Sequence, residues 1–468
     1  MTRLPSGSAR SLAALAGTGV ASDYAESLLA ALGVRTERSG SPPDPHPAAL
    51  WAASGAMALT GHEDGPPRLA PGPLAACAVG AVRALGALAP DAVLPGDPAA
   101  LLGERGALTG ARRRGRIAPG GSCRLLRCGD GWIALNLARS DDRRALPAWL
   151  ESAPHPGESG WEHAARVAAD RPVATLLERA GWLGLPVALA APPPQHPPDW
   201  VRIEKLGAPL HRETATRPLV IDLSGLWAGP LATALLRATG ARVIKVESTR
   251  RPDGARAGAR RFFDLLNAGK ESVALDFDAP RDRARLRALI DRADILVESA
   301  RPRALRQLGI DATALLATHP GLVWLSLTGY GRREPEPGRV AFGDDAAVAA
   351  GLAEAMGRDE GAPLFCGDAI ADPLSGAHAA LATFAAWRAG GGLLLDVSLC
   401  DVVAHVLTFA PGCCDGARVE PAGRDRYRVC GDGWETPVAA PRARPPAPAA
   451  RPLGTDTQRV LSELAASC

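Results

Sequence analysis

The stretch from residue 219 to residue 246 limits the fold of this chain more than any other feature. Leu219–Leu223 is an apolar run typical of a buried strand, Leu231–Thr239 has helical spacing, and Arg242–Val246 is a second apolar run. Gly240 separates the helix from the second run. A strand, a helix and a strand in this order predict a parallel sheet, because parallel neighbours need a crossover connection.

The same alternation continues along the chain. Further strands are predicted at Val273–Phe277, Ile295–Glu298 and Leu322–Leu327, with a helix at Arg281–Arg292 between the first two. We therefore expect an α/β protein with a Rossmann-like, doubly wound parallel sheet, accompanied by a smaller α+β domain.

A dinucleotide-binding enzyme is a rival interpretation of this unit. Glu247 ends the second strand 22 residues after Gly225, where such folds place the acid that binds the ribose. However, the turn Gly225–Pro230 contains no G-x-G-x-x-G pattern, and the bulky Trp227 lies where a pyrophosphate needs close backbone approach. A nicotinamide-dependent dehydrogenase is therefore disfavoured.

The chain also repeats itself at an offset of 296 residues. The stretch that begins at Ala53 aligns without a gap to the stretch that begins at Ala349. Further on, Cys128–Trp132 reads C-G-D-G-W, and the same five residues recur at Cys430–Trp434. Two copies of one domain in a single chain are the simplest explanation, and they predict an internal pseudo-dimer.

The two copies are unequal in a way that bears on function. Asp372, at the predicted start of a helix, aligns with Ala76, so the first copy lacks this carboxylate. The first copy has an abbreviated front end but a longer continuation after Trp132, whereas the second copy gives way after Trp434 to a Pro- and Ala-rich connector. Because the losses are complementary, we expect one composite site, with the first copy closing over the second.

Composition excludes several classes of protein. The formal charge of +3, from 53 Lys and Arg against 50 Asp and Glu, does not favour a nucleic-acid binder, and Arg112–Arg114 is interpreted as a solvated face. The nine cysteines show no metal-binding spacing, which favours a reduced cytoplasmic enzyme without a metal. The apolar run at 74–94 is interrupted by charge and proline, and no signal peptide is expected around Pro5 and Arg10.

Several stretches in order resemble the class III CoA-transferase family, the group of formyl-CoA, carnitine and bile-acid CoA-transferases. The resemblance covers roughly Arg217 to Val406. The stretches that carry it are Asp222–Pro230, Gly240–Glu247, Phe262–Asp276, Ala293–Ile310, Leu327–Gly331, Ala341–Leu352, Ala371–Gly376 and Leu394–Asp401. Gly454–Leu464 is similar to the closing helix of that family.

The resemblance implies that Asp372 is a nucleophile. Its carboxylate would attack an acyl-CoA thioester to give a mixed anhydride and then an aspartyl thioester, and a free carboxylic acid would take the CoA. The alternative from the residues alone is that Asp372 only caps the helix opened by Pro373.

The resemblance also implies that coenzyme A lies over the carboxyl ends of the strands. The positions that match its CoA-binding loops are Leu226, Trp227, Ala228, Leu275, Asp276, Ser299 and Ala300, and the basic residues nearest to the expected phosphate contacts are Arg250 and Arg306. The chain departs from the family at Ser299-Ala300, Ser248 and Gln307, which leaves the arginines that bind the phosphates open.

Two alternative functions stay open at this point. A 2-methylacyl-CoA racemase is one, but the segment Ala341–Asp345 contains no histidine to act as a base. A non-catalytic CoA-binding protein is the other, and the presence of a carboxylate at Asp372 disfavours it. His378 is expected to pack on its own helix.

The sequence predicts four segments. They are a degenerate copy at 1–122, a small domain at 123–200, a CoA-binding catalytic domain at 216–411, and a truncated small domain with a closing helix at 412–468. The expected partners are an acyl-CoA donor and a carboxylate acceptor, with no nucleic acid or membrane, and the internal pseudo-dimer allows a monomeric enzyme.

Overall fold

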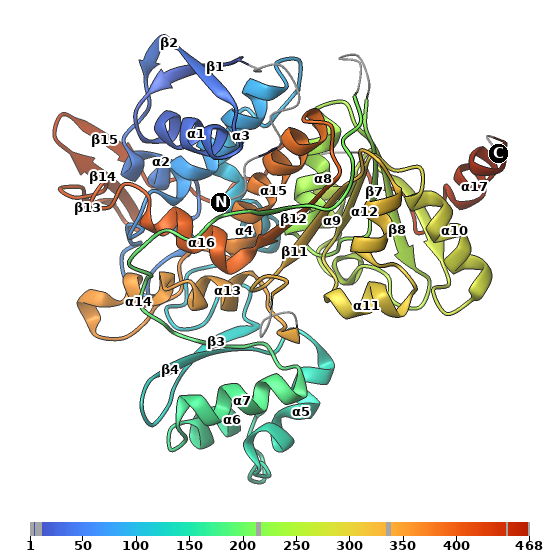
Figure 1. Cartoon of the computed structure of the whole chain (residues 1–468). Helices are drawn as coiled ribbons and strands as arrows, with labels where there is room; N and C mark the ends of the chain where they lie inside the picture. Colours follow the sequence, from blue (N-terminus) through green and yellow to red (C-terminus); the bar gives the residue numbers. More distant parts are fainter. Residues whose placement is uncertain (1–3, 5–11, 212–216, 334–337, 446–447, 467–468) are drawn as a thin grey trace.

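The structure is a computed structural model of the whole chain. It describes all residues except 1–3, 5–11, 212–216, 334–337, 446–447 and 467–468 (Figure 1). The predicted domain boundary at Thr216 and the residues Pro5 and Arg10 lie outside the described residues.

A seven-stranded sheet forms the centre of the molecule, in the order β6-β12-β11-β10-β7-β8-β9. Six of its strands are parallel, and β6 pairs antiparallel with β12 at the edge. The strands are β6 (Arg202–Lys205), β7 (Leu219–Asp222), β8 (Arg242–Ser248), β9 (Glu271–Leu275), β10 (Ile295–Glu298), β11 (Val323–Thr328) and β12 (Leu393–Ser398). The chain first builds the sheet outward from β7 to β9 and then continues with β10 on the other side of β7. The loops after β7 and β10 therefore lie side by side at the carboxyl edge, the place where open α/β sheets bind ligands.

Helices cover both faces of this sheet. Alternate strand residues separate into two apolar clusters: Val220 belongs to the cluster that contains α8 and α15, whereas Ile221 belongs to the cluster that contains α10 and α12. The helices of this part are α8 (Ala228–Ala238), α9 (Arg260–Asn267), α10 (Pro280–Ile290), α11 (Pro302–Gln307), α12 (Ala312–Thr318), α13 (Gly343–Ala349), α14 (Leu352–Met356), α15 (Ala371–Arg388), α16 (Leu399–Thr408) and α17 (Thr457–Ala466). The expected mixed α/β architecture with a parallel sheet is confirmed.

The N-terminal part begins with a smaller strand–helix–strand unit. β1 (Leu12–Thr18) pairs in parallel with β2 (Arg35–Pro43) across α1 (Val20–Ala31). It continues with α2 (Pro47–Ala53), α3 (Leu74–Leu88) and α4 (Glu104–Thr109). Figure 1 shows α3 beside α15, and one apolar cluster contains residues of both helices. The N-terminal part and the central sheet therefore share a core.

Two small antiparallel sheets complete the molecule. One consists of β3 (Cys123–Arg127), β4 (Trp132–Asn136) and β5 (Val187–Leu189), covered by α5 (Ser140–Leu150), α6 (Gly160–Ala168) and α7 (Val173–Leu183). The other consists of β13 (Arg418–Gly423), β14 (Arg426–Gly431) and β15 (Trp434–Pro437). Both copies of the C-G-D-G-W sequence lie at a hairpin turn, between β3 and β4 and between β14 and β15.

The predicted elements differ from the observed ones mainly at their ends. The strand predicted at Val273–Phe277 lies two residues earlier, because Asp276 turns the chain: its side chain accepts the N–H of Asp278 at 3.1 Å. The strands β6 and β12 were not predicted. Among the described residues, no helix combines the length and apolar character needed to cross a bilayer.

Candidate functional site

Asp372 lies in the first turn of α15, where it is half-buried with its carboxylate against a glycine. Its backbone N–H bonds the carbonyl of Ala369 at 2.9 Å, the N-cap is Ile370, and no side chain caps the helix. A Cβ added to Gly343 would lie 2.2 Å from Oδ2 of Asp372. The alternative that Asp372 is the N-cap residue is therefore wrong, because the helix begins at Ala371, two residues before Pro373.

The surroundings of Asp372 favour its neutral form more than water does. Burial raises its pKa to about 7, the nearby Arg105 opposes this, and the carboxylate of Asp344 adds to it. The backbone N–H of Ala228, at the start of α8, bonds the carboxylate and lowers the pKa. A carboxyl group in this condition changes its charge near neutral pH.

Arg105 comes from α4 in the N-terminal part and forms the basic wall next to Asp372. Its guanidinium forms a two-point ion pair with Asp368, with Nε 2.8 Å from Oδ2. It also lies over the ring of Trp227, 5.1 Å from the centroid. The Asp368 carboxylate is almost fully buried, whereas 27% of the Arg105 side chain is exposed, so the guanidinium reaches the surface of the adjacent cavity.

Two more carboxylates lie in the turn that opens α13. Oδ1 of Asp344 accepts the N–H of Ala369 at 2.8 Å, which fixes the turn that precedes Asp372. Asp345 accepts the side chain of Asn136, on β4, at 2.9 Å, and burial raises its pKa to about 7. Burial also raises the pKa of Asp344. The N-terminal part thus contacts this acidic cluster at two points, through Arg105 and Asn136.

A cavity of about 590 Å³ opens in front of Asp372. Its walls come from segments that are far apart in the sequence. Those from the N-terminal part are Glu63, Arg105, Thr109–Arg112, Arg114, Pro119, Gly120, Ser122, Asn136 and Ala138, and those from the larger part are Leu226, Trp227, Ala255, Gly258, Ala259, Phe262, Phe342–Asp344, Ala369 and Asp372. Its volume is in the range of small-molecule sites.

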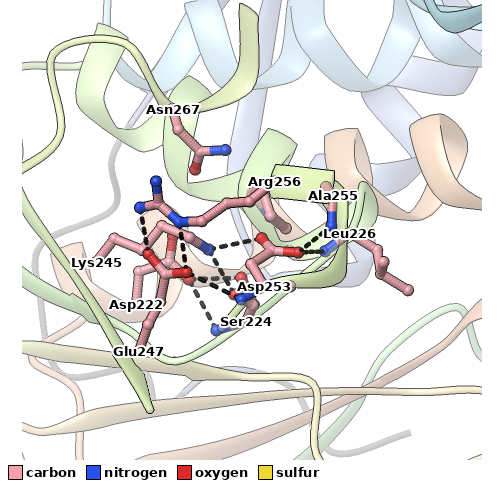
Figure 2. Close-up of polar contacts among 12 residues, drawn as sticks. Asp222, Ser224, Leu226, Lys245, Glu247, Asp253, Ala255, Arg256 and Asn267 are labelled. Carbon is pink, nitrogen blue, oxygen red and sulfur yellow. Dashed lines mark hydrogen bonds and ion pairs between the residues drawn. The ribbon is translucent and has the colours of Figure 1, made fainter. Parts of the chain in front are cut away.

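The loop after β7 is held by a network of charges (Figure 2). Asp253 accepts the N–H of Leu226 at 2.9 Å and pairs with Nζ of the buried Lys245 at 3.0 Å. Glu247, at the end of β8, pairs with Arg256 and accepts the N–H of Asp253. Leu226 is thereby held at φ +66°, a strained conformation for a leucine, with its side chain half exposed. Glu247, the acid that would bind the ribose in a dinucleotide-binding fold, is therefore paired with an arginine of the protein itself.

The predicted site residues separate into two groups. Asp372, Leu226 and Trp227 line the cavity. Six others are absent from its described lining: Arg250, Leu275, Asp276, Ser299, Ala300 and Arg306. Ala228 contacts Asp372 through its backbone.

The second group follows the carboxyl ends of the strands. Ser299 Oγ accepts the N–H of Gly225 at 3.2 Å, which joins the loops after β10 and β7. Arg250 is exposed and pairs with Asp276 and Asp278. Leu275 is buried in the apolar cluster beneath.

Sequence reasoning missed Arg105, Asp368 and Asp344. Arg105 lies in a short helix without a recognisable motif, and only its contact across the fold gives it a role. Of Arg112–Arg114, the first and the last are exposed as predicted and also line the cavity. Arg113 differs from the prediction, because it is half-buried and donates to the carbonyls of His62 and Gly65. His378 is buried as expected and accepts from the hydroxyl of Tyr24.

Comparison with known proteins gives one family and a set of partial relatives. Residues 218–432 match the family described as CoA-transferase family III. A succinate–glutarate CoA-transferase from Agrobacterium fabrum is 31% identical, covering 40% of this chain and 51% of the relative. An acetyl-CoA:oxalate CoA-transferase from Acetobacter aceti is 31% identical, over 44% and 55% of the two chains.

A formyl-CoA:oxalate CoA-transferase from Afipia carboxidovorans is 30% identical, over 48% of this chain and 55% of the relative. The chain therefore spans about half the length of the curated relatives it matches. The crystal structure of a CAIB/BAIF family protein from Brucella suis is 25% identical, with a TM-score of 0.39, over 46% of this chain and 65% of that one.

Proposed function

We propose that this chain, whose residues 218–432 belong to CoA-transferase family III, moves CoA from an acyl-CoA thioester to a free carboxylic acid. The observation that carries the proposal is the place of Asp372: a half-buried carboxylate on the wall of a cavity, next to a guanidinium and a backbone N–H. Its relatives are named for this reaction with different acids.

In the proposed reaction Asp372 acts as a covalent nucleophile. Its carboxylate attacks the thioester carbonyl, which gives a mixed anhydride and releases CoA thiolate. The thiolate then attacks the aspartyl carbonyl, which releases the first acid and leaves an aspartyl thioester. The second acid displaces the thiolate to form a new anhydride, and the thiolate attacks its acyl carbonyl, which regenerates Asp372.

The neighbours of Asp372 suit these steps. Arg105 and the N–H of Ala228 favour the carboxylate over the neutral acid, so they oppose the effect of burial and keep a nucleophile available near neutral pH. Burial in turn keeps water away from the anhydride and the thioester, which hydrolyse readily.

We place CoA along the carboxyl edge of the central sheet, near Leu226–Ala228, Leu275-Asp276 and Ser299-Ala300. The strand order, with its change of direction between β7 and β10, supports this Rossmann-like interpretation. The hydrogen bond from the N–H of Gly225 to Ser299 joins the two loops at that point. Arg250 and Arg306 are exposed nearby and available for phosphate groups, although Arg250 would have to leave Asp276 and Asp278.

We further propose that the two copies form an internal pseudo-dimer. Repeated positions make equivalent contacts: a Cβ on Gly80 would meet the carbonyl of Ala21 in α1 at 2.6 Å, and one on Gly376 would meet that of Ala228 in α8 at 2.8 Å. The connectors that follow the small sheets also cross reciprocally: Gly55 (φ +81°) meets Pro441, and Gly351 (φ +91°) meets Pro193. Reciprocal contacts are the signature of a two-fold interface.

Two acid–arginine pairs support the same arrangement. Glu104, in the first copy, pairs with Arg444 after the second small sheet, and Asp401, in the second copy, pairs with Arg202 after the first small sheet. Since Arg105 and Asn136 belong to the first copy, the pseudo-dimer would supply one composite site around Asp372. The segment limits 1–122, 123–200, 216–411 and 412–468 are part of this proposal.

A cytoplasmic location is also proposed, on the free state of the eight cysteines among the described residues.

A transfer assay with the full chain tests the proposed function. Wild-type protein, given an acyl-CoA and a panel of free acids, should form the new thioester, and Asp372→Asn should lower the rate on the order of 10³-fold or more while keeping the same circular dichroism spectrum. Protein that binds CoA without any turnover would instead be a non-catalytic CoA-binding protein.

A further inference from the structure

Two neighbouring cysteines, Cys413 and Cys414, lie in the turn that follows α16. Their sulfur atoms are 3.8 Å apart, and both side chains are half-buried. Adjacent side chains of an extended chain point to opposite sides, but residues 411–416 form a turn. The N–H of Cys413 bonds the carbonyl of Ala410 at 3.2 Å, and Ala410 has a φ of +46°. The turn therefore keeps two thiols in contact at a place that solvent reaches.

The contact makes the two thiols unequal. The thiol of Cys414 donates to the sulfur of Cys413, and this hydrogen bond lowers the pKa of Cys413 and raises the pKa of Cys414. Cys414 also packs against the apolar core that the N-terminal part shares with the central sheet, and burial raises its pKa further. Because the thiolate is the form that attacks a disulfide, Cys413 is the nucleophile of the pair.

Other cysteines of the chain lie in surroundings that favour the unreactive thiol. Cys430 is half-buried, and burial and the carboxylate of Glu420, 3.5 Å from its sulfur, raise its pKa. Burial also raises the pKa of four fully enclosed cysteines, which are Cys77, Cys123, Cys128 and Cys366. A reaction of Cys413 should therefore be selective.

The internal repeat relates this turn to a wall of the cavity in front of Asp372. The triplet Ala-Pro-Gly at 410–412 repeats the one at 118–120, and each comes ahead of a small sheet. Residues 119, 120 and 122 line the cavity. Burial and then the charge of Cys413 raise the pKa of Cys77, which follows the residue aligned with Asp372. The place that the repeat pairs with the site of Asp372 thus carries thiols.

We propose that Cys413 and Cys414 form a redox-active dithiol that reacts reversibly with the disulfide of a low-molecular-weight thiol. The thiolate of Cys413 attacks one sulfur of the disulfide, which forms a mixed disulfide and releases one thiolate. Cys414 loses its proton to solvent and attacks Sγ of Cys413, which closes a disulfide between the two residues and releases the second thiolate. The two protein thiols lose two electrons in total, and the small disulfide is reduced to two thiols, which take up the two protons.

The disulfide formed in this way is easily opened again. Neighbouring residues have Cα atoms about 3.8 Å apart across a trans peptide. Ordinary disulfides join Cα atoms that are about 4.4 Å or more apart, and departures from this geometry store strain that makes the bond more reducible. An excess of the reduced small thiol therefore reverses the reaction.

The test incubates the full chain with glutathione disulfide, blocks the remaining thiols with iodoacetamide and identifies each cysteine peptide by mass spectrometry. In wild type, the peptide with both cysteines should lose two hydrogens and regain them with dithiothreitol. Cys414→Ser should stop at the mixed disulfide on Cys413. In Cys413→Ser, Cys414 should react roughly tenfold more slowly, because burial still raises its pKa. The matched control is Cys430→Ser, which removes a half-buried cysteine outside the pair and should leave the reaction unchanged.

Three results would overturn the proposal. The first is a mixed disulfide as the end product in wild type, which would show that Cys414 does not displace the small thiol. The second is a reaction at Cys413 that is no faster than at Cys430. The third is an undiminished rate at Cys414 in Cys413→Ser, which would make Cys414 the attacking thiol. If a variant fails to fold, the comparison of Cys413 with Cys430 within the wild-type protein still decides.

Discussion

Arg105 and Asp368, which are 263 residues apart in the sequence, form a two-point ion pair. Asp368 lies four residues before Asp372 in the chain. The pair joins the N-terminal part to the turn that opens α15. It puts a positive charge beside Asp372, which aligns with Ala76 at the offset of 296 residues. The N-terminal part thus has no carboxylate at the aligned position and supplies a cation next to Asp372.

Replacing Arg105 tests this contribution through the pH dependence of the rate. Arg105→Lys keeps the charge, so the acid limb of the pH–rate profile should stay near pH 7. In Arg105→Gln the limb should move to higher pH, because the charge that lowers the pKa of Asp372 is gone. A purely structural role would lower the rate equally at every pH.

The Gln variant also leaves Asp368 buried without a partner, which costs roughly 3–5 kcal/mol of folding free energy. The double variant R105Q/D368N removes both charges and should regain stability, yet remain slow. A double variant with the wild-type rate would show that the guanidinium has no part in the reaction.

Asp372 should cost the protein stability at alkaline pH. Its pKa is raised by burial to about 7 in the folded protein, above its ordinary value in the unfolded chain. Between about pH 4 and pH 7 the folded state holds a proton that the unfolded state has lost, so this group lowers stability as the pH rises through that range. Asp372→Asn should therefore be more stable than wild type by roughly 1–3 kcal/mol at pH 8, and about equal at pH 4, in denaturant titrations. Equal free energies of unfolding for wild type and Asp372→Asn at pH 8 would show that folding does not raise the pKa of Asp372.

Gly343 should be essential for the position of Asp372. A Cβ at this residue would lie 2.2 Å from Oδ2 of Asp372 and 2.5 Å from the carbonyl of Ala369, so one of them must move. Gly343→Ala should lower kcat roughly tenfold to hundredfold, because a nucleophile displaced by a fraction of an ångström loses its geometry. Gly96→Ala is the matched control, since nothing lies within 4 Å of its Cβ. Similar kcat values for Gly343→Ala and Gly96→Ala would show that Gly343 is not needed to position Asp372.

A chain that begins at Arg217 should lose transfer altogether or release acyl groups to water. It lacks Arg105, Asn136 and the rest of the N-terminal wall of the cavity, and it uncovers the face of α15 that packs on α3. Rates of thioester formation and of hydrolysis, measured side by side, test this expectation. Transfer at the rate of the full chain would show that the first copy is only a stabilising remnant.

The sequence predicted five neighbouring strands of the central sheet, β7 to β11, because each carries a local apolar signal bounded by turn residues. It predicted Asp372 because that residue lies in a recognisable order of motifs. It could not predict Arg105 or Asp344, since their roles depend on contacts between segments that no local pattern connects. The edge strand β6 was missed for a similar reason: Arg202–Lys205 contains one apolar residue, and only pairing with β12 makes it a strand.

The central claim is that Asp372 becomes covalently acylated, and mass spectrometry of the peptide that contains it is the most direct test. Full-length protein is incubated with an acyl-CoA, then quenched with hydroxylamine, which converts an activated aspartyl group to a hydroxamate. The account predicts a hydroxamate at Asp372 that requires the acyl-CoA and is absent from Asp372→Asn. An unmodified Asp372 in protein that is turning over acyl-CoA would contradict the account.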